Sequence, residues 1–177
     1  MRILVACEMS GRVREAFTAR GHYAVSCDLL PSLVPGRHVQ GDCLSLINES
    51  WDMLLAFPPC TYLTRAAVHL RHKNELAADR AVQFVKHLWQ SPIALVCIEN
   101  PVGMLNKRWQ YPSQVVNPTM FGDISSKKTC LWYRGLPPLM ATAVTIPTAS
   151  HVLAHRSPKI RSMLSPYLAS AMAEQWG

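Results

Sequence analysis

Short apolar runs alternate along this chain with segments whose apolar residues recur every three or four positions. A short, continuous apolar run is typical of a strand that is buried on both faces of a parallel sheet. Such runs predict strands at residues 2–7, 23–27, 52–56, 93–98 and 129–133, and a short strand end at 39–43.

The predicted helices lie between these runs. Apolar residues recur at helical spacing within residues 12–20, and Gly21 stands where a helix stop belongs. The strongest helical pattern covers residues 75–89, and a closing helix begins near Pro166. The predicted apolar stripe of the 75–89 helix consists of Leu76, Ala77, Ala81, Phe84, Val85 and Leu88.

This alternation of strands and helices predicts an α/β fold, in which a mostly parallel sheet carries helices on both faces. A length of 177 residues suits one domain of ordinary size. The hydrophobic share of 49% is normal for a globular protein. The sequence contains no internal repeat and no clear linker. We therefore expect a single domain over residues 1–177.

The sequence carries no membrane, export or metal signal. No apolar run approaches the ~20 residues that span a bilayer, and the beginning of the chain predicts a buried strand rather than a signal peptide. The six cysteines form no CxxC pair and no cluster with zinc spacing, so we expect no metal site. These features favour a soluble protein in the reducing cytoplasm, with no membrane partner.

The balance of charges favours an anionic partner. The chain has 18 Lys and Arg residues against 11 Asp and Glu, which gives a formal net charge of +7. Basic surfaces gain free energy when they displace counterions from phosphates, and this favours nucleic acid. A charge of this size is also compatible with solubility alone, so both interpretations stay open here.

Acidic and turn residues follow the first three predicted strands, at the sheet edge where α/β proteins bind ligands. Glu8, Ser10 and Gly11 follow the first strand, Asp28 closes the second, and Asp42 follows the third. Asp28 is placed to accept ribose hydroxyls, and Asp42 to accept from an adenine amino group. Ser10 and Gly11 allow close approach of backbone but form no phosphate-binding loop. The pattern predicts a nucleoside with few or no phosphates, although each acid alone is more often a loop or cap residue.

Cys60 is the most informative residue of the sequence. Two prolines precede it and hold its side chain at a defined place after the 52–56 strand. A thiol there is a candidate nucleophile if nearby positive charge lowers its pKa. Glu99, followed by Asn100 and Pro101, ends the next strand and is the candidate acid. A buried thiol and a loop glutamate are the alternative, but the two motifs at successive strand ends favour catalysis.

The segments Phe57–Cys60 and Glu99–Pro101 resemble the PPC and EN(V/P) motifs of DNA (cytosine-5) methyltransferases. The order of the cofactor segments agrees, although Glu8–Gly11 lacks the usual FxGxG form. Residues 121–139 are similar to short phage and prophage proteins of this kind. The resemblance covers most of residues 1–140 and implies a Rossmann-like, class I methyltransferase domain. For a phage-encoded protein, the location would be the host cytoplasm.

The resemblance implies S-adenosylmethionine as the cofactor and cytosine in DNA as the substrate. The Cys60 thiolate would attack ring carbon C6, and Glu99 would hold or protonate N3 as negative charge develops on the ring. Pro59 and Asn100 would shape the pocket around the base, which must first be flipped out of a duplex. The residues that would bind the cofactor are Glu8, Ser10, Gly11, Asp28, Asp42 and Phe57.

Basic residues at two places match segments that contact DNA in this family. Arg65, Arg71 and Lys73 fall in the stretch that corresponds to its mobile catalytic loop, where they would contact phosphates. A solvated helix face is an equal interpretation of that stretch. Lys127 and Lys128 fall near the basic residues that contact the target base or backbone.

The chain departs from the family in one large respect. Only about thirty-five residues separate Lys128 from the closing helix, too few for a target-recognition domain with its own core. We therefore expect a short or relaxed target, or specificity supplied by a homodimer or another partner. Three alternatives stay open: methylation of a free pyrimidine nucleotide, methylation of RNA, and a non-catalytic module that binds cofactor or DNA.

Overall fold

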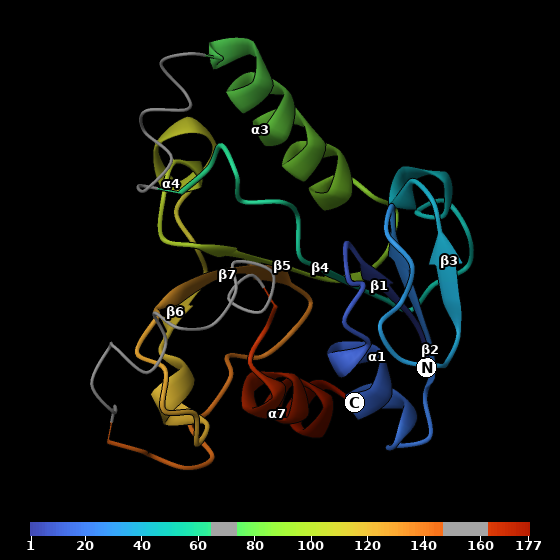
Figure 1. The fold of residues 1–177 in the computed structure, drawn as a ribbon, viewed down its shortest axis with the longest axis vertical. Helices are drawn as coiled ribbons and strands as arrows, with labels where there is room; N and C mark the ends of the chain where they lie inside the picture. Colours follow the sequence, from blue (N-terminus) through green and yellow to red (C-terminus); the bar gives the residue numbers. More distant parts are fainter. Residues whose placement is uncertain (65–73, 147–162) are drawn as a thin grey trace.

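The computed structural model describes residues 1–64, 74–146 and 163–177. Seven strands form one sheet in the order β3-β2-β1-β4-β5-β7-β6 (Figure 1). The first five strands are parallel, whereas β7 pairs antiparallel with both β5 and β6. The strands are β1 (Arg2–Ala6), β2 (Tyr23–Asp28), β3 (His38–Gln40), β4 (Met53–Ala56), β5 (Leu95–Pro101), β6 (Gln114–Val116) and β7 (Thr129–Arg134).

Helices cover both faces of this sheet (Figure 1). Two of them, α1 (Arg12–Thr18) and α7 (Pro166–Trp176), lie on one face. The other face carries α3 (Glu75–Trp89) and α4 (Leu105–Arg108). Two short 3₁₀ helices, η1 (Cys43–Ser45) and η3 (Pro118–Met120), complete the described elements. No helix within the described ranges is both long and apolar enough to cross a bilayer.

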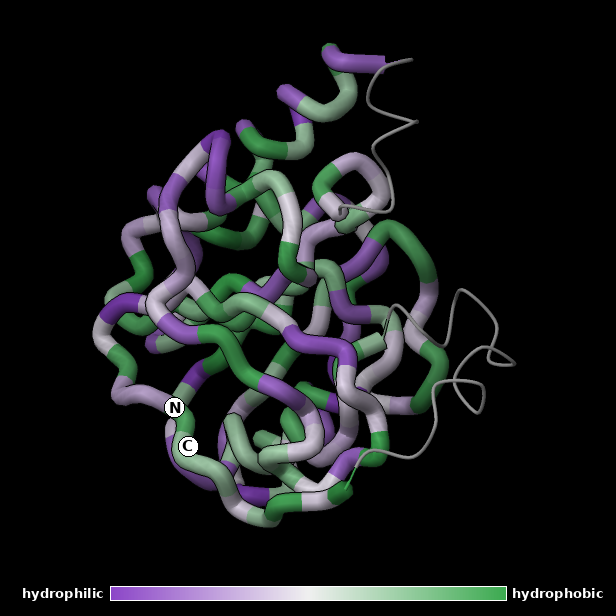
Figure 2. The backbone as a smooth tube through the Cα atoms, turned by 90° about the vertical axis from the view of Figure 1, so that its left-hand side faces the viewer, coloured by the Kyte–Doolittle hydropathy of each residue, from purple (hydrophilic) through white to green (hydrophobic). Residues whose placement is uncertain are grey.

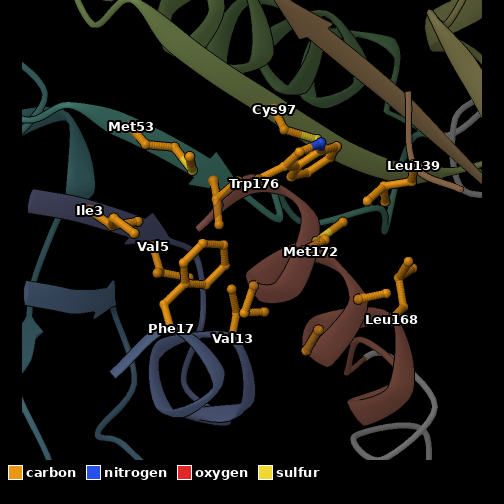
Figure 3. Packing of buried hydrophobic residues seen from close by; sticks show 14 of the residues in the cluster. Ile3, Val5, Val13, Phe17, Met53, Cys97, Leu139, Leu168, Met172 and Trp176 are labelled. Atoms are coloured by element: carbon orange, nitrogen blue, oxygen red, sulfur yellow. The ribbon is translucent and has the colours of Figure 1, made fainter. Parts of the chain in front are cut away.

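Two apolar cores explain why the strands are continuously hydrophobic. On the α1 and α7 face, Phe17 and Trp176 pack over Val5, Met53 and Cys97 of the sheet (Figure 3). Alternate residues of the same strands point to the other face and form a second cluster with α3 and α4. A strand between two cores has no polar face, so the continuous runs are a direct consequence of the layering.

The predicted α/β class, the mostly parallel sheet and the helices on both faces are confirmed, and the fold is Rossmann-like. The predicted stripe of α3 is wrong in its first turn. Leu76 is 61% exposed, whereas Ala78 and Val82 are buried. The reason is that the first turns of α3 extend beyond the sheet (Figures 1 and 2). At this end of α3, acidic residues of the helix form ion pairs with Arg108 of α4. The helix therefore does not pack on an apolar surface there.

The end of β5 also differs from the sequence prediction. The sequence places Glu99, Asn100 and Pro101 after the strand, but β5 continues through all three. They pair with β7, whose register places Leu131 opposite Glu99 and Thr129 opposite Pro101. This pairing joins residues about thirty positions apart, and a local hydrophobic pattern does not reveal it.

A buried guanidinium joins α1 to the segment that follows β2. Arg14 is 1% exposed, and a Cβ on Gly36 would lie 2.7 Å from its guanidinium. Its N–H groups donate to side-chain oxygens of Glu15, Ser26 and Ser32 and to the carbonyls of Val34 and Pro35. All five donors of the guanidinium are thereby used. Arg14 therefore fixes the chain just after Asp28, one of the predicted site residues.

We expect Arg14→Met to lower the free energy of unfolding by about 3 kcal/mol, because several oxygens lose their donor. The matched control is Arg20→Met. The Nη2 of Arg20 lies 3.9 Å from a carboxylate oxygen of Glu174, and both side chains are about half exposed. Loss of this pair should change stability by less than about 0.5 kcal/mol. Urea unfolding of both variants tests the difference, and equal losses would contradict the assigned role of Arg14.

Candidate active site

The predicted site residues meet at the edge formed by the carboxyl ends of the parallel strands. The sheet order places β2 and β3 on one side of β1, and β4, β5 and β7 on its other side. We therefore describe this edge as two halves. One half contains the ends of β1, β2 and β3 and the predicted cofactor residues. The other half contains the loop after β4, the end of β5 and the start of β7, with the predicted catalytic residues. Parallel pairing of β4 with β5 brings the two catalytic motifs side by side.

The loop after β4 is anchored by hydrogen bonds to its neighbours. The backbone N–H of Phe57 donates to the carbonyl of Ala6 at 2.9 Å. The buried Pro58 offers its carbonyl to Nδ2 of Asn100, at 2.8 Å. Pro59 is exposed and directly precedes Cys60. The two prolines have no N–H to donate, so the N–H of Phe57 and the carbonyl of Pro58 tie this loop to the sheet.

A second set of contacts fixes the chain just after Cys60. The N–H of Leu63 donates to the Cys60 carbonyl at 2.9 Å, which closes a turn. The carbonyl of Leu63 in turn accepts the N–H of Met104 at 2.7 Å. A Cβ on Gly103 would lie 2.0 Å from the Leu63 carbonyl oxygen. The segment after β5 therefore packs directly against the turn that carries Cys60, and only a glycine permits this approach.

The Cys60 thiol is half-buried and is not sealed in either core. Burial raises the pKa of Cys60, the positive charge of Lys127 lowers it, and the Glu99 carboxylate raises it. The expectation that positive charge lowers this pKa is thus only partly right, because burial outweighs Lys127. Because Lys127 and Glu99 both influence the pKa of Cys60, the three side chains lie within electrostatic reach of one another.

A residue of β7 forms a hydrogen bond with the Glu99 side chain. Its Oε1 accepts a hydrogen bond from the hydroxyl of Thr129. Burial raises the pKa of Glu99, while the Thr129 hydroxyl and the charge of Lys127 lower it in part. The net rise means that this carboxyl group keeps a proton at a higher pH than an exposed glutamate does. A proton donor and a thiol therefore share one corner of the sheet edge.

Asn100 links the two motifs structurally. Its side chain is 1% exposed, and its Nδ2 holds the Pro58 carbonyl. Its Oδ1 is buried and has no hydrogen-bond partner among the described residues. The side chain is oriented by the loop that precedes Cys60, so its observed contact is a tie between strands. This tie fixes the backbone just before Pro59 and Cys60.

In the other half, Glu8 organises the turn from β1 to α1. It is only 5% exposed. Its Oε1 accepts from the Ser10 hydroxyl at 2.6 Å and from the N–H of Val13 at 3.2 Å. Burial raises the pKa of Glu8, and these hydrogen bonds lower it in part. The second oxygen, Oε2, is buried and has no hydrogen-bond partner in the described parts of the chain.

The turn itself depends on an unusual backbone. Cys7 has a φ of 58° and Gly11 a φ of 76°, both in the left-handed region. A Cβ on Gly11 would lie 2.3 Å from a methyl group of Val34. The glycine thus allows the segment that Arg14 holds to pack against the start of α1. The hydroxyl of Ser10, a predicted cofactor-binding residue, donates to Glu8 and accepts the N–H of Arg12.

Asp28 and Asp42 each use one oxygen for a local turn. Asp28 Oδ1 accepts the N–H of Leu30, and Asp42 Oδ1 accepts that of Leu44, both at 2.9 Å. The cap interpretation is therefore correct for these oxygens. Burial, Cys43 and then the charges of Asp28 and Asp42 raise the pKa of Cys27 to about 11. Since both acids act on the same thiol, Asp28 and Asp42 lie close together.

This half of the edge can accept hydrogen bonds from a nucleoside. The buried Oε2 of Glu8 and the second oxygens of Asp28 and Asp42 are acceptors, as ribose hydroxyls, an amino group or an ammonium group require. A phosphate would instead meet three acidic groups. Among the described residues, no group of His, Cys, Asp or Glu is arranged to hold a metal ion. The residues present fit an adenosine cofactor without phosphates.

The predicted DNA contacts are only partly described. Lys127 and Lys128 are both exposed, and Lys127 is near enough to Cys60 and Glu99 to influence both. The other three residues, Arg65, Arg71 and Lys73, lie outside the described residues. Sequence reasoning missed Arg14, Gly103 and Thr129. Their contacts join distant segments, and only Gly103, two residues after the end of β5, offered a local signal.

Neither a family model nor a curated protein matches the chain. A solved structure with a similar fold is an E. coli protein described as a candidate DNA modification methyltransferase encoded within a prophage. The TM-score is 0.57 at 12% sequence identity, and the match covers 89% of this chain. The chain spans only 55% of the length of that protein. At this identity the likeness is one of fold.

We expect Gly103→Ala to displace the turn after Cys60, because the new Cβ would collide with the Leu63 carbonyl. The loss of stability should be about 1–3 kcal/mol, with faster alkylation of Cys60 by iodoacetamide. Gly41→Ala is the control, since nothing lies within 4 Å of its Cβ, and it should change stability by less than about 0.5 kcal/mol. Unfolding and alkylation rates of both variants test this; an unchanged Gly103→Ala protein would contradict the geometry.

Proposed function

We propose that the protein is a DNA methyltransferase that transfers a methyl group from S-adenosylmethionine to C5 of cytosine. The observation that carries this proposal is that Cys60, Glu99 and Lys127, from three separate segments, lie within electrostatic reach of one another. A nucleophile, an acid and a cation are the groups that addition to a cytosine ring requires. The fold likeness to a candidate DNA modification methyltransferase supports methyl transfer to DNA in general.

S-adenosylmethionine would bind at the ends of β1, β2 and β3. Asp28 and Asp42 would accept from the ribose and the adenine, and Glu8 would offer its unpartnered Oε2 to the ammonium group. Phe57, fixed by its backbone bond to β1, lies between the two halves of the edge. Once bound, the cofactor supplies an electrophilic methyl group on its sulfonium.

The residues of the other half would activate the cytosine. The Cys60 thiolate forms a bond to C6, and Glu99 gives its proton to N3 as negative charge reaches the ring. The electron pair released to C5 then takes the methyl group. A base removes the proton from C5, the bond between C6 and sulfur breaks, and Cys60 leaves as thiolate while N3 returns the proton to Glu99.

The directions in which the pKa values of Glu99 and Cys60 are shifted bear on this order of events. The raised pKa of Glu99 keeps its proton available for N3. The raised pKa of Cys60 means that the free protein holds a thiol, which must ionise before attack. Lys127 favours the thiolate because its charge is of opposite sign. Activity therefore requires the ionised thiol and the protonated acid together, so it should pass through a maximum with pH and fall on both sides.

A free pyrimidine nucleotide is a second candidate substrate, because the stretch of about thirty-five residues between Lys128 and α7 is too short for a target-recognition domain with its own core. The net charge of +7 favours DNA, since a polyanion gains more than a single nucleotide from a basic surface. The two substrates are distinguished by direct comparison.

The function is tested by incubating the protein with methyl-labelled S-adenosylmethionine and either unmethylated duplex DNA or dCMP. The DNA is then digested to nucleosides and analysed by mass spectrometry. We expect 5-methylcytosine in the DNA, and a loss of at least about a thousandfold in Cys60→Ser with cofactor affinity unchanged. Label on an adenine, on an exocyclic amino group, or undiminished in Cys60→Ser would refute the proposed chemistry, and transfer only to dCMP would favour the second candidate.

Two neighbouring lysines separate catalysis from DNA binding. In Lys127→Gln the charge that lowers the pKa of both Cys60 and Glu99 is lost, so the pH–rate profile should move to higher pH by about half a unit or more. Lys128→Gln is the matched comparison. It should weaken DNA binding and reduce the salt dependence of binding, with an unmoved pH profile. Identical profiles for the two variants would contradict the placement of Lys127.

A further inference from the structure

Thr129 is the first residue of β7, and its hydroxyl donates to Oε1 of Glu99. We infer that Thr129 is a positioning residue that orients Glu99 and determines which of its two oxygens carries the proton. The inference rests on the proposed function for its catalytic meaning. The hydrogen bond itself is a property of the folded chain and can be tested without turnover.

The pairing of β5 with β7 makes this contact possible. Glu99 lies opposite Leu131, and Thr129 lies two residues away opposite Pro101. Residues two apart on a strand point to the same face, so Thr129 is the diagonal neighbour of Glu99 on one face of the sheet. Thr129 is 5% exposed. A buried hydroxyl requires a partner, and Glu99 provides it.

The contact makes the two oxygens of Glu99 unequal. When Glu99 is ionised, the Thr129 hydroxyl can only donate, because a carboxylate has no proton to give. With Oε1 occupied as an acceptor, a proton that arrives on Glu99 is directed to Oε2. The neutral acid then presents Oε2–H as its donor, which is the form that the transfer to N3 requires.

Few other groups compete for this proton. Lys127 and Cys60 approach Glu99 from other segments, Cys97 lies on the same strand, and Cys130 lies on β7. Burial raises the pKa of Cys97 well above its ordinary value and that of Cys130 to about 11, so both stay neutral thiols near pH 7. Among the residues that the structure describes, this leaves Lys127 and Cys60 to contribute charge, and neither distinguishes the two oxygens as a directed hydrogen bond does.

Carbon-13 NMR of protein labelled at the glutamate carboxyl carbon tests the inference directly. The chain has six glutamates, Glu8, Glu15, Glu49, Glu75, Glu99 and Glu174. Comparison with a Glu99→Gln variant assigns the Glu99 signal. In Thr129→Val, which keeps the shape but not the hydroxyl, the midpoint of the Glu99 titration should rise by about half to one pH unit.

Two further variants serve as controls. Thr129→Ser keeps the donor and should restore the wild-type titration. Thr119→Val removes the hydroxyl of another buried threonine. The backbone N–H of Thr119 donates to Asn117 and its carbonyl accepts from Thr145, and valine keeps both hydrogen bonds. It should leave the Glu99 titration unmoved. A Glu99 midpoint that is unchanged in Thr129→Val, or moved equally in Thr119→Val, would overturn the inference.

Methyl transfer gives the second readout. In Thr129→Val the limb of the pH–rate profile that follows Glu99 should move upward with the Glu99 midpoint, and kcat should fall while KM for DNA stays within about twofold. Thr129→Ser should recover both. If the wild-type protein transfers no methyl group to cytosine, the proposed function fails, yet the NMR titration still decides whether Thr129 controls Glu99. If transfer occurs and the limb does not move, the positioning role fails alone.

Discussion

The antiparallel pairing of β5 with β7 is the constraint on which the candidate site depends. Because β5 continues through Glu99 and Asn100 instead of ending before them, both residues are held by the ladder to β7, beyond Ile98, where the ladder to β4 ends. One side of that ladder leads to Asn100 and the loop that carries Cys60. The other side brings Thr129 against Glu99 and places Lys127 just before the strand. Without this pairing, the acid, the thiol and the cation would belong to three independent loops.

The site also concentrates groups that a folded protein normally avoids. Glu8 and Asn100 both have a buried side-chain oxygen without a hydrogen-bond partner among the described residues. Cys7 adopts a left-handed backbone conformation that is rare for a residue with a side chain. Glu99 and Glu8 hold carboxyl groups where burial raises their pKa. Such features lower stability and are typical of functional sites, where ligands or chemistry compensate for them.

Much of the fold and part of the site follow from the sequence. The strands are predictable because two cores leave each of them no polar face, and the proximity of Cys60 and Glu99 follows from their places after neighbouring parallel strands. The exposure of Leu76 was not predictable, because it depends on where α3 leaves the sheet. The contacts of Arg14 and Thr129 join distant segments, and the burial that raises the pKa of Cys60 is a tertiary property. The catalytic and binding roles themselves stay predictions.

The central claim is that Cys60 bonds reversibly to a cytosine ring. It is tested most directly with duplex DNA that contains 5-fluorocytosine in place of cytosine, in the presence of S-adenosylmethionine. Fluorine at C5 cannot leave as a proton does, so the ring should stay attached to the protein after methyl transfer. The account predicts a denaturation-resistant complex whose cross-linked peptide contains Cys60. Methyl transfer to ordinary cytosine without such a complex, or a cross-link at another residue, would contradict it.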